Sequence, residues 1–183
     1  MEENGWRCDW YRGLAHAHNY NKIQRHGDSF KMVGTANTFQ PHGLHYMWDQ
    51  GRIHYNSHEI WYMPSAYIDE ELSKHWFTNV VKSSSSDEKK LDVTAKLNDK
   101  GDSLFIYVAN ISEHDQPAVM DIANFNYKSR AEVWSIGGCD LTETNSAENK
   151  KNVSPKTSKT TLSRKNAKYT FPRYSYTIIK LKR

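Results

Sequence analysis

The chain closes with the stretch Tyr169-Thr-Phe-Pro-Arg-Tyr-Ser-Tyr-Thr-Ile-Ile-Lys-Leu-Lys-Arg183, and this stretch decides the fold class. It indicates one strand, a proline break and a final strand. Pro172 has no amide hydrogen to donate to a sheet, so it marks an edge or a kink. After it, Thr177, Ile179 and Leu181 fall on one face, and the residues between them fall on the other. Such a closing strand is typical of a β-sandwich.

The rest of the second half carries the same strand signals. Turn-forming clusters at residues 83–87, 98–102 and 137–138 separate short apolar segments. About seven short strands at this spacing indicate a sandwich or jelly roll. Residues 143–165 are poor in apolar side chains and are expected to form a long exposed connection. The predicted strands are residues 77–82, 91–97, 103–110, 118–123, 130–136, 168–171 and 174–182.

The first half carries helical signals instead. Apolar residues recur at helical spacing over residues 10–26, with Asp9 as a suitable N-cap and Gly27 as a stop. A second helix is expected to start at Pro64, because proline fits the first turn of a helix, and to continue toward Trp76.

Between these helices, residues 30–36 form a short apolar run typical of a buried strand, and residues 52–62 are expected to be extended. A helix, a buried strand, a loop and a second helix correspond to about one unit of a (β/α) barrel. One unit cannot close by itself. The sequence therefore predicts a mainly β protein, in which a partial (β/α) barrel remnant with two helices, residues 1–76, precedes an antiparallel β-sandwich or jelly roll, residues 77–183.

A barrel remnant of this size leaves apolar side chains of residues 30–36 and 67–76 uncovered. Surface of this kind is usually buried by a partner. We expect the N-terminal piece either to pack onto the sandwich or to form a homo-oligomer.

Composition and charge exclude several classes of protein. The formal net charge is +4, yet residues 149–183 hold eleven Lys or Arg and no Asp or Glu. These cations alternate with strand residues and lack any nucleic-acid motif, so a solvated face is expected rather than nucleic-acid binding. No apolar run is long enough to span a membrane, and no signal peptide opens the chain. Either a cytoplasmic location or secretion after processing fits this pattern.

The chain has only two cysteines, Cys8 and Cys139, which can make neither a disulfide framework nor a CxxC zinc site. His42 and His45 lie in one loop and could bind a metal, but two ligands fall short of the usual three or four, so no metal is expected. The eleven Tyr, six Trp and six Phe suit a β-sheet core and also the stacking of aromatic rings on sugars.

Several motifs, taken in order, resemble the C-terminal portion of the α-L-arabinofuranosidases of glycoside hydrolase family 51. They include Gly13-Leu-Ala-His-Ala-His-Asn19, Trp48-Asp-Gln-Gly-Arg-Ile-His54, Trp61-Tyr-Met-Pro-Ser-Ala-Tyr67 and the closing stretch. The resemblance implies a TIM barrel followed by a jelly roll, and retaining hydrolysis of terminal arabinofuranosyl units. It also implies plant cell-wall polysaccharide or arabinose-containing oligosaccharide as the partner, and no cofactor.

Retaining glycosidases need two carboxylates about 5 Å apart. In the family that this chain resembles, both carboxylates lie on barrel strands that precede the first helix, so the acid/base strand is missing here. Glu2 and Glu3 lie near the place where the nucleophile region would stop, but a solvated N-terminus explains them better. Two functions stay open: a truncated arabinofuranosidase-like hydrolase, or a non-catalytic sandwich that binds carbohydrate or mediates assembly.

Three further residues are candidates for substrate binding. Asn37 falls at the carboxyl end of the presumed last barrel strand, where the resemblance implies an amide that hydrogen-bonds arabinose; otherwise it is a turn residue before Pro41. Trp48 and Trp61 flank the loop over the barrel mouth, where they could form a sugar platform or belong to the core.

Overall fold

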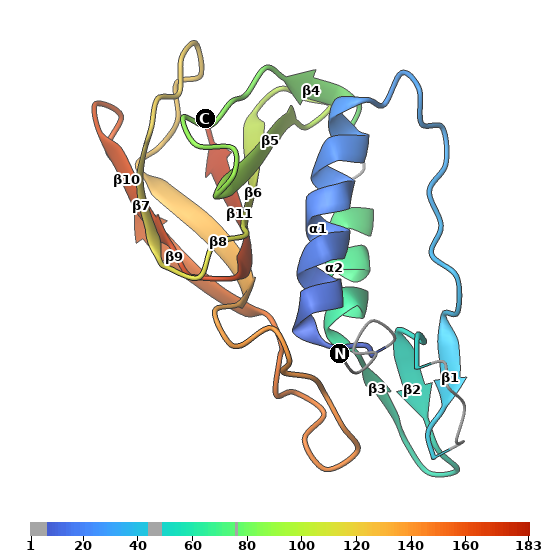
Figure 1. Ribbon diagram of the computed structural model, residues 1–183. Helices are drawn as coiled ribbons and strands as arrows, with labels where there is room; N and C mark the ends of the chain where they lie inside the picture. The colour runs from blue at the N-terminus through green and yellow to red at the C-terminus, as the bar shows by residue number, and fades with distance from the viewer. Residues whose placement is uncertain (1–6, 44–48, 76) are drawn as a thin grey trace.

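The computed structural model describes residues 7–43, 49–75 and 77–183 of the chain (Figure 1). Two helices and eleven strands follow one another within these ranges. In chain order they are α1 (Trp10–Arg25), β1 (Phe39–Pro41), β2 (Ile53–Tyr55), β3 (Ile60–Tyr62), α2 (Pro64–Ser73), β4 (Asn79–Val81), β5 (Leu91–Leu97), β6 (Ser103–Asn110), β7 (Gln116–Met120), β8 (Arg130–Gly137), β9 (Lys156–Thr161), β10 (Ala167–Phe171) and β11 (Ser175–Lys182).

A six-stranded antiparallel sheet forms the centre of the molecule, in the order β4-β5-β6-β11-β8-β9. Strands β7 and β10 pair as an antiparallel ribbon on one face of this sheet. Helices α1 and α2 pack on the opposite face, as Figure 1 shows. The prediction of a mainly β protein with an antiparallel sandwich and two helices is therefore confirmed.

The closing strand β11 contributes to both cores because its side chains alternate between the faces of the sheet. Ile179 and Leu181 belong to the apolar cluster under the ribbon, together with Phe171 of β10. Tyr176 and Ile178 belong to the cluster under the helices. The two faces predicted from the closing stretch are those that the structure has.

The connection between β10 and β11 passes from the ribbon into the main sheet at Pro172. The fully buried side chain of Asn110 holds this crossing, because its amide donates to the carbonyl oxygens of Phe171 at 3.0 Å and Pro172 at 2.8 Å. The hydroxyl of Ser175 also donates to Pro172 O at 2.6 Å. The predicted break at Pro172 is thus a change of sheet.

Helix α1 begins after Asp9, whose carboxylate accepts a hydrogen bond of 3.1 Å from the backbone N–H of Arg12. This is the N-cap that the sequence predicts, and the helix ends within one residue of the predicted end. Its apolar side chains Trp10, Leu14 and Ala17 are buried against the sheet.

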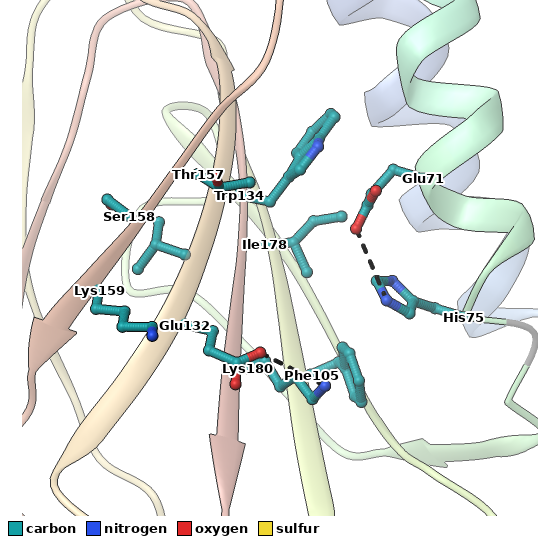
Figure 2. A pocket seen from close by; sticks show the side chains of 11 residues that line it. Glu71, His75, Phe105, Glu132, Trp134, Thr157, Ser158, Lys159, Ile178 and Lys180 are labelled. Carbon is teal, nitrogen blue, oxygen red and sulfur yellow. Dashed lines mark ion pairs between the residues drawn. The ribbon is translucent and has the colours of Figure 1, made fainter.

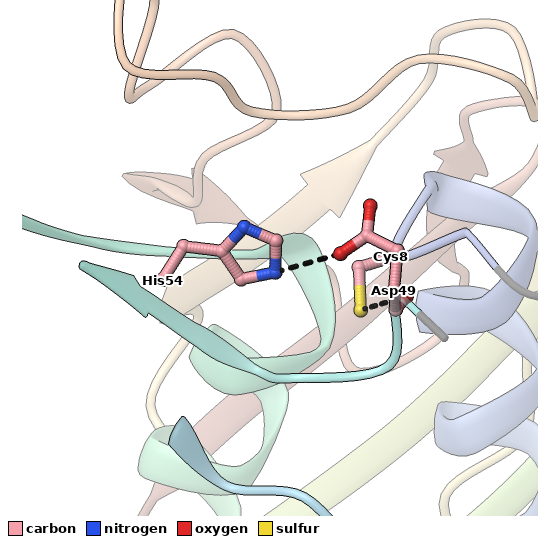
Figure 3. A group of neighbouring side chains, drawn as sticks. All are labelled: Cys8, Asp49 and His54. Atoms are coloured by element: carbon pink, nitrogen blue, oxygen red, sulfur yellow. Dashed lines mark hydrogen bonds and ion pairs between the residues drawn. The ribbon is translucent and has the colours of Figure 1, made fainter. Parts of the chain in front are cut away.

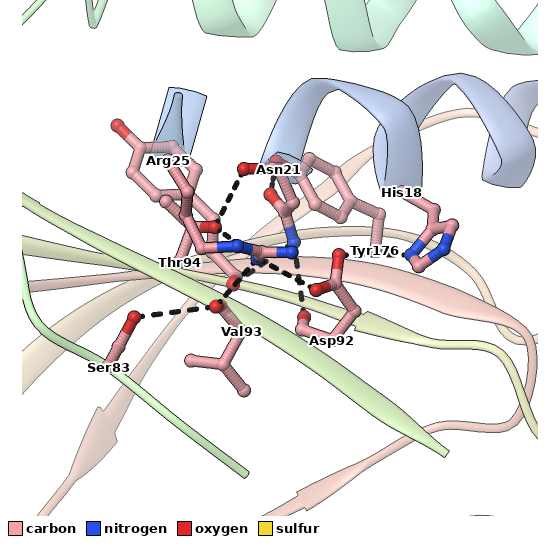
Figure 4. A network of polar contacts seen from close by, with 9 residues as sticks. His18, Asn21, Arg25, Ser83, Asp92, Val93, Thr94 and Tyr176 are labelled. Atoms are coloured by element: carbon pink, nitrogen blue, oxygen red, sulfur yellow. Dashed lines mark hydrogen bonds and ion pairs between the residues drawn. The ribbon is translucent and has the colours of Figure 1, made fainter. Parts of the chain in front are cut away.

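A polar network fastens the second half of α1 to β5 (Figure 4). The carboxylate of Asp92, which is 7% exposed, lies 2.8 Å from Nη1 of Arg25 and 3.0 Å from Nδ1 of His18. Arg25 also donates to Oγ1 of Thr94 at 2.7 Å. Because a buried carboxylate is costly unless it is paired, these contacts fix the register of the helix along the strand.

Helix α2 begins at Pro64, as the sequence predicts, and ends at Ser73. Its Ile68 is fully buried in the same cluster as Trp10 and Tyr107. Residues on either side of position 76 therefore share one core, and the N-terminal helices pack onto the sandwich. The domain boundary at residues 76 and 77 stays a prediction.

Residues 30–36 are not the buried strand that the sequence suggests. They pair with no strand among the described residues and are largely exposed, with Phe30 at 51% and Met32 at 88%. A strand needs neighbours to satisfy its backbone and cover its faces, and none lies beside this segment. The barrel remnant is not confirmed.

A small sheet of β1, β2 and β3 forms within the range predicted to be a barrel remnant. Strand β1 pairs in parallel with β2, and β2 pairs antiparallel with β3. The predicted extended segment 52–62 is the β2–β3 hairpin, and the side chain of Asn56 accepts from the backbone N–H groups of His58 and Glu59, both at 2.9 Å, in its turn.

Strands β1 and β9 were not predicted from the sequence, and β9 is the longer of the two. Strand β9 lies inside the expected connection 143–165 and pairs with β8 at the edge of the main sheet. Most of its side chains are exposed, so it lacks the apolar alternation that reveals a strand. Neither helix among the described residues is long and apolar enough to cross a membrane.

Candidate functional site

A cleft of about 700 Å³ opens between the end of α2 and the part of the main sheet that the helices leave uncovered (Figure 2). Helix α2 and the turn after it contribute Glu71 and His75. Strands β6, β8, β9 and β11 contribute the floor. The residues that line the cleft are Glu71, His75, Phe105, Glu132, Val133, Trp134, Thr157, Ser158, Lys159, Ile178 and Lys180.

The register of the strands arranges the floor in rows. Phe105 pairs with Lys180, Lys180 with Glu132, and Glu132 with Lys159, so these four side chains form one row across four strands. The next row on the same face runs through Ile178, Trp134 and Thr157. Charged and aromatic side chains therefore share one face of the sheet.

The carboxylate of Glu132 is held by two cations of β11. Nζ of Lys182 donates to it at 2.8 Å, and Nζ of Lys180 lies 3.6 Å away. The hydrogen bond from Lys182 lowers the pKa of Glu132 below its usual value. Lys180 also lies 5.4 Å from the centre of the Phe105 ring. Glu132 is thus an ionised hydrogen-bond acceptor and a poor proton donor near neutral pH.

The other wall of the cleft comes from α2. The carboxylate of Glu71 lies 3.2 Å from Nζ of Lys74 and 3.8 Å from Nε2 of His75. Burial lowers the pKa of His75, which leaves its ring neutral at neutral pH. That ring lies 4.5 Å from the centre of the Phe105 ring. This wall offers one carboxylate and one imidazole beside an aromatic floor.

This arrangement suits binding of a hydroxyl-rich ligand better than acid/base catalysis. Carboxylates and ammonium groups exchange hydrogen bonds with hydroxyl groups. A retaining pair needs one carboxyl group with a raised pKa. Glu132 has the opposite shift, and Glu71 is already paired with Lys74.

The family of the chain follows from its sequence. Residues 5–175 match the model of the alpha-L-arabinofuranosidase C-terminal domain. The chain belongs to this family. The resemblance to the C-terminal portion of the family 51 α-L-arabinofuranosidases is thereby confirmed.

Solved structures share the fold of this family member. An α-L-arabinofuranosidase from Thermotoga maritima in complex with arabinose is 19% identical, with a TM-score of 0.82 over 96% of this chain and 39% of its own. The arabinose-bound α-L-arabinofuranosidase MgGH51 is 17% identical, with a TM-score of 0.87 over 97% of this chain and 28% of its own. The chain thus spans less than two fifths of either structure. Comparison with curated proteins finds no match.

Asn37 and Trp61, two of the sequence-predicted site residues, do not line the cleft. Asn37 is exposed, precedes β1 and has a left-handed backbone with φ 56°. Trp61, on β3, is only 3% exposed and packs against the rings of His42 and His54, with centroid distances of 5.1 and 5.9 Å. Their roles in substrate binding stay predictions. Glu2, Glu3 and Trp48 lie outside the described residues.

Sequence reasoning missed the cleft because strand register is not visible in one sequence. The alternation in the closing stretch does place Ile178 and Lys180 on the same face as Tyr176. The neighbours that complete the surface, Glu132 and Lys159, come from β8 and the unpredicted β9. The cleft could have been predicted only if β9 had been recognised as a strand from its sequence.

Proposed function

We propose that this chain acts as the C-terminal part of an α-L-arabinofuranosidase that releases arabinofuranosyl units from hemicellulose such as arabinoxylan or arabinan. The match of residues 5–175 to the family carries this proposal. It is supported by the likeness to two arabinofuranosidase structures that contain arabinose.

In this proposal, the catalytic carboxylate pair comes from residues outside this chain. Retaining hydrolysis needs two carboxyl groups about 5 Å apart with different pKa values. Burial raises the pKa of Asp9, but its carboxylate is engaged as the N-cap of α1. Glu132 has a lowered pKa and is paired with lysines. Neither suits the role of proton donor.

The exposed apolar segment at residues 30–36 supports the same proposal. Phe30, Met32 and Val33 are 51%, 88% and 38% exposed. Apolar side chains that lie close together in the sequence are usually buried. We expect neighbouring barrel strands to cover them in the complete enzyme. Without those strands, a second copy of the chain is the expected partner, and its mass in solution is the measurement.

An activity assay tests the proposal directly. The chain alone should not turn over p-nitrophenyl α-L-arabinofuranoside or arabinoxylan, and the same chain joined to a family 51 catalytic barrel should turn over both. Turnover by the chain alone that disappears in Glu2→Gln or Glu3→Gln would place the nucleophile here and reject the proposed division of roles. An Asn37→Ala variant of the joined protein tests the predicted substrate contact through a raised KM.

A second candidate function is carbohydrate binding without catalysis, which the cleft favours. Its charged side chains, Glu132, Lys159 and Lys180, offer hydrogen bonding to a glycan. Lys159→Ala and Thr157→Ala alter only exposed side chains of β9 and should weaken retention of the chain on immobilised arabinoxylan. Lys168→Ala, exposed on β10, is the matched control. Equal retention of all three variants and the wild type would reject binding in the cleft.

A further inference from the structure

Three side chains from separate segments meet at the start of α1 (Figure 3). Cys8 precedes the helix, Asp49 lies in the loop before β2, and His54 lies on β2. One ligand atom of each, a sulfur, a carboxylate oxygen and a ring nitrogen, lies within 4.8 Å of the other two. Cys8 lies 41 residues before Asp49 in the sequence, so only the fold brings all three side chains together.

Backbone carbonyl groups of the loop before β2 surround the sulfur of Cys8. Sγ of Cys8 donates to Gly51 O at 2.9 Å and to Asp49 O at 3.2 Å, and Nη1 of Arg12 donates to Sγ at 3.7 Å. The loop is held from its other side by Oε1 of Gln40, which accepts from Gly51 N at 2.7 Å. A Cβ at position 51 would lie 2.2 Å from Cβ of Gln40, so only glycine lets the loop pass there.

The imidazole of His54 points into this cluster, but its Nε2 finds no hydrogen-bond partner there. The residue is 5% exposed, and its Nε2 lies 3.1 Å from Oδ1 of Asp49. Neither of these two buried atoms makes a hydrogen bond of acceptable geometry within the part of the chain that the structure describes. Because an unsatisfied buried polar atom is costly, such a group in a native fold calls for a ligand or a role.

We propose that Cys8, Asp49 and His54 bind one Zn²⁺ ion. Thiolate, imidazole and carboxylate are the three protein ligands that zinc prefers, and this mixture excludes Ca²⁺ and Mg²⁺, which need oxygen ligands alone. Ligand atoms on a tetrahedral zinc ion are roughly 3.5 Å apart, so side-chain shifts of about 1 Å close the site. The thiol proton passes to solvent on binding, His54 binds through Nε2, and water takes the fourth position.

The ion would join two parts of the molecule, the start of α1 and the segment around β2. Cys8 precedes α1, which packs on the main sheet, whereas His54 lies on β2 and Asp49 lies in the loop before it. Binding would therefore fix the small sheet relative to α1. This inference stands independently of the proposed glycosidase function.

Cobalt is the probe, because Co²⁺ replaces Zn²⁺ and a thiolate ligand gives a sulfur-to-cobalt charge-transfer band in the near ultraviolet. The chain, stripped with a chelator, should bind one equivalent of Co²⁺ with this band, and Zn²⁺ should abolish it. An excess of Mg²⁺ or Ca²⁺ should leave it unchanged. Absence of the band, or its loss with Mg²⁺ or Ca²⁺, overturns the proposal.

Variants assign the ligands. Cys8→Ser should remove the band, and His54→Asn should weaken Co²⁺ binding on the order of 100-fold. Asp49→Asn should weaken it at least tenfold, and this residue is partly exposed, so the variant keeps the fold even where the other two do not. Cys139→Ser and His58→Asn are the matched controls and should bind like the wild type. Unchanged binding in Asp49→Asn, or a lost band in Cys139→Ser, overturns the assignment.

Discussion

The hydroxyl of Tyr176 donates a 3.0 Å hydrogen bond to the side-chain oxygen of Asn21, and both residues are fully buried. Tyr176 lies on β11 and Asn21 on α1, 155 positions apart in sequence. The amide nitrogen of Asn21 donates in turn to the backbone oxygen of Asp92 at 3.1 Å. The first helix is therefore attached to the centre of the main sheet by directional polar contacts as well as by apolar packing.

Replacing Tyr176 by Phe should lower the free energy of unfolding by about 1–2 kcal/mol, because the buried oxygen of Asn21 loses its donor. Urea denaturation of wild type and variant measures the difference. Tyr11→Phe, at a position 64% exposed, is the control and should change nothing. Equal midpoints for the two variants would show that the buried hydrogen bond contributes no stability.

Replacing Gly137 by Ala should destabilise the fold by more than about 2 kcal/mol. Its backbone has φ 93°, and a Cβ there would lie 2.4 Å from Tyr174 O and 2.5 Å from the ring of Trp10. Gly101→Ala is a matched control, because Gly101 has φ 67° but nothing within 4 Å of the added carbon. The Gly101→Ala substitution should lower the free energy of unfolding by about 1 kcal/mol through backbone strain alone. Thermal unfolding separates the two; equal losses would contradict the predicted clash.

Stability should fall between pH 6.5 and pH 4 because of His16. Burial, followed by the positive charges of Arg12 and Arg52, lowers the pKa of His16 from 6.5 to about 4. Within this window the His16 imidazole is protonated in the unfolded chain but neutral in the folded chain, so acid favours unfolding. His16→Gln should reduce the slope of unfolding free energy against pH. His114→Gln, at an exposed position, should keep it; identical slopes in all three proteins would refute the assignment.

Stability should rise between pH 8 and pH 10.5 because of Lys96. This residue is 4% exposed, and burial lowers its pKa from 10.5 to about 8. The folded chain loses the proton first, so the unfolded chain holds more protons across this window and alkali favours the folded state. Lys96→Met should flatten the rise, whereas the exposed Lys100→Met should not. The measurement is urea denaturation at pH 7.5, 9 and 10.

Local periodicity was enough to predict the elements whose own residues bury a face. Strand β11 alternates between two apolar clusters, and β5 and β6 have the predicted bounds, because a strand inside a sheet buries a pattern that its sequence must carry. Asp9 and Pro64 marked the starts of both helices for equally local reasons.

The remaining features depend on partners that are distant in sequence. Residues 30–36 carry strand residues but pair with no strand in the part of the chain that the structure describes, whereas β9 carries exposed residues but has β8 beside it. The cleft needs the register of four strands. The cluster of Cys8, Asp49 and His54 needs a chain reversal that brings positions 41 residues apart into contact, whereas the histidine pair considered from sequence spacing was His42 with His45.

The composition of β9 bears on how this protein behaves at high concentration. A strand at the rim of a sheet offers free backbone groups to any extended chain that approaches, which is how fibrillar aggregates grow. Lys156 and Lys159 stand exposed along that rim, and a second molecule docking there in the same way would bring ammonium groups together. The lysines that make β9 hard to recognise as a strand thus keep the sandwich from growing sideways into a fibre.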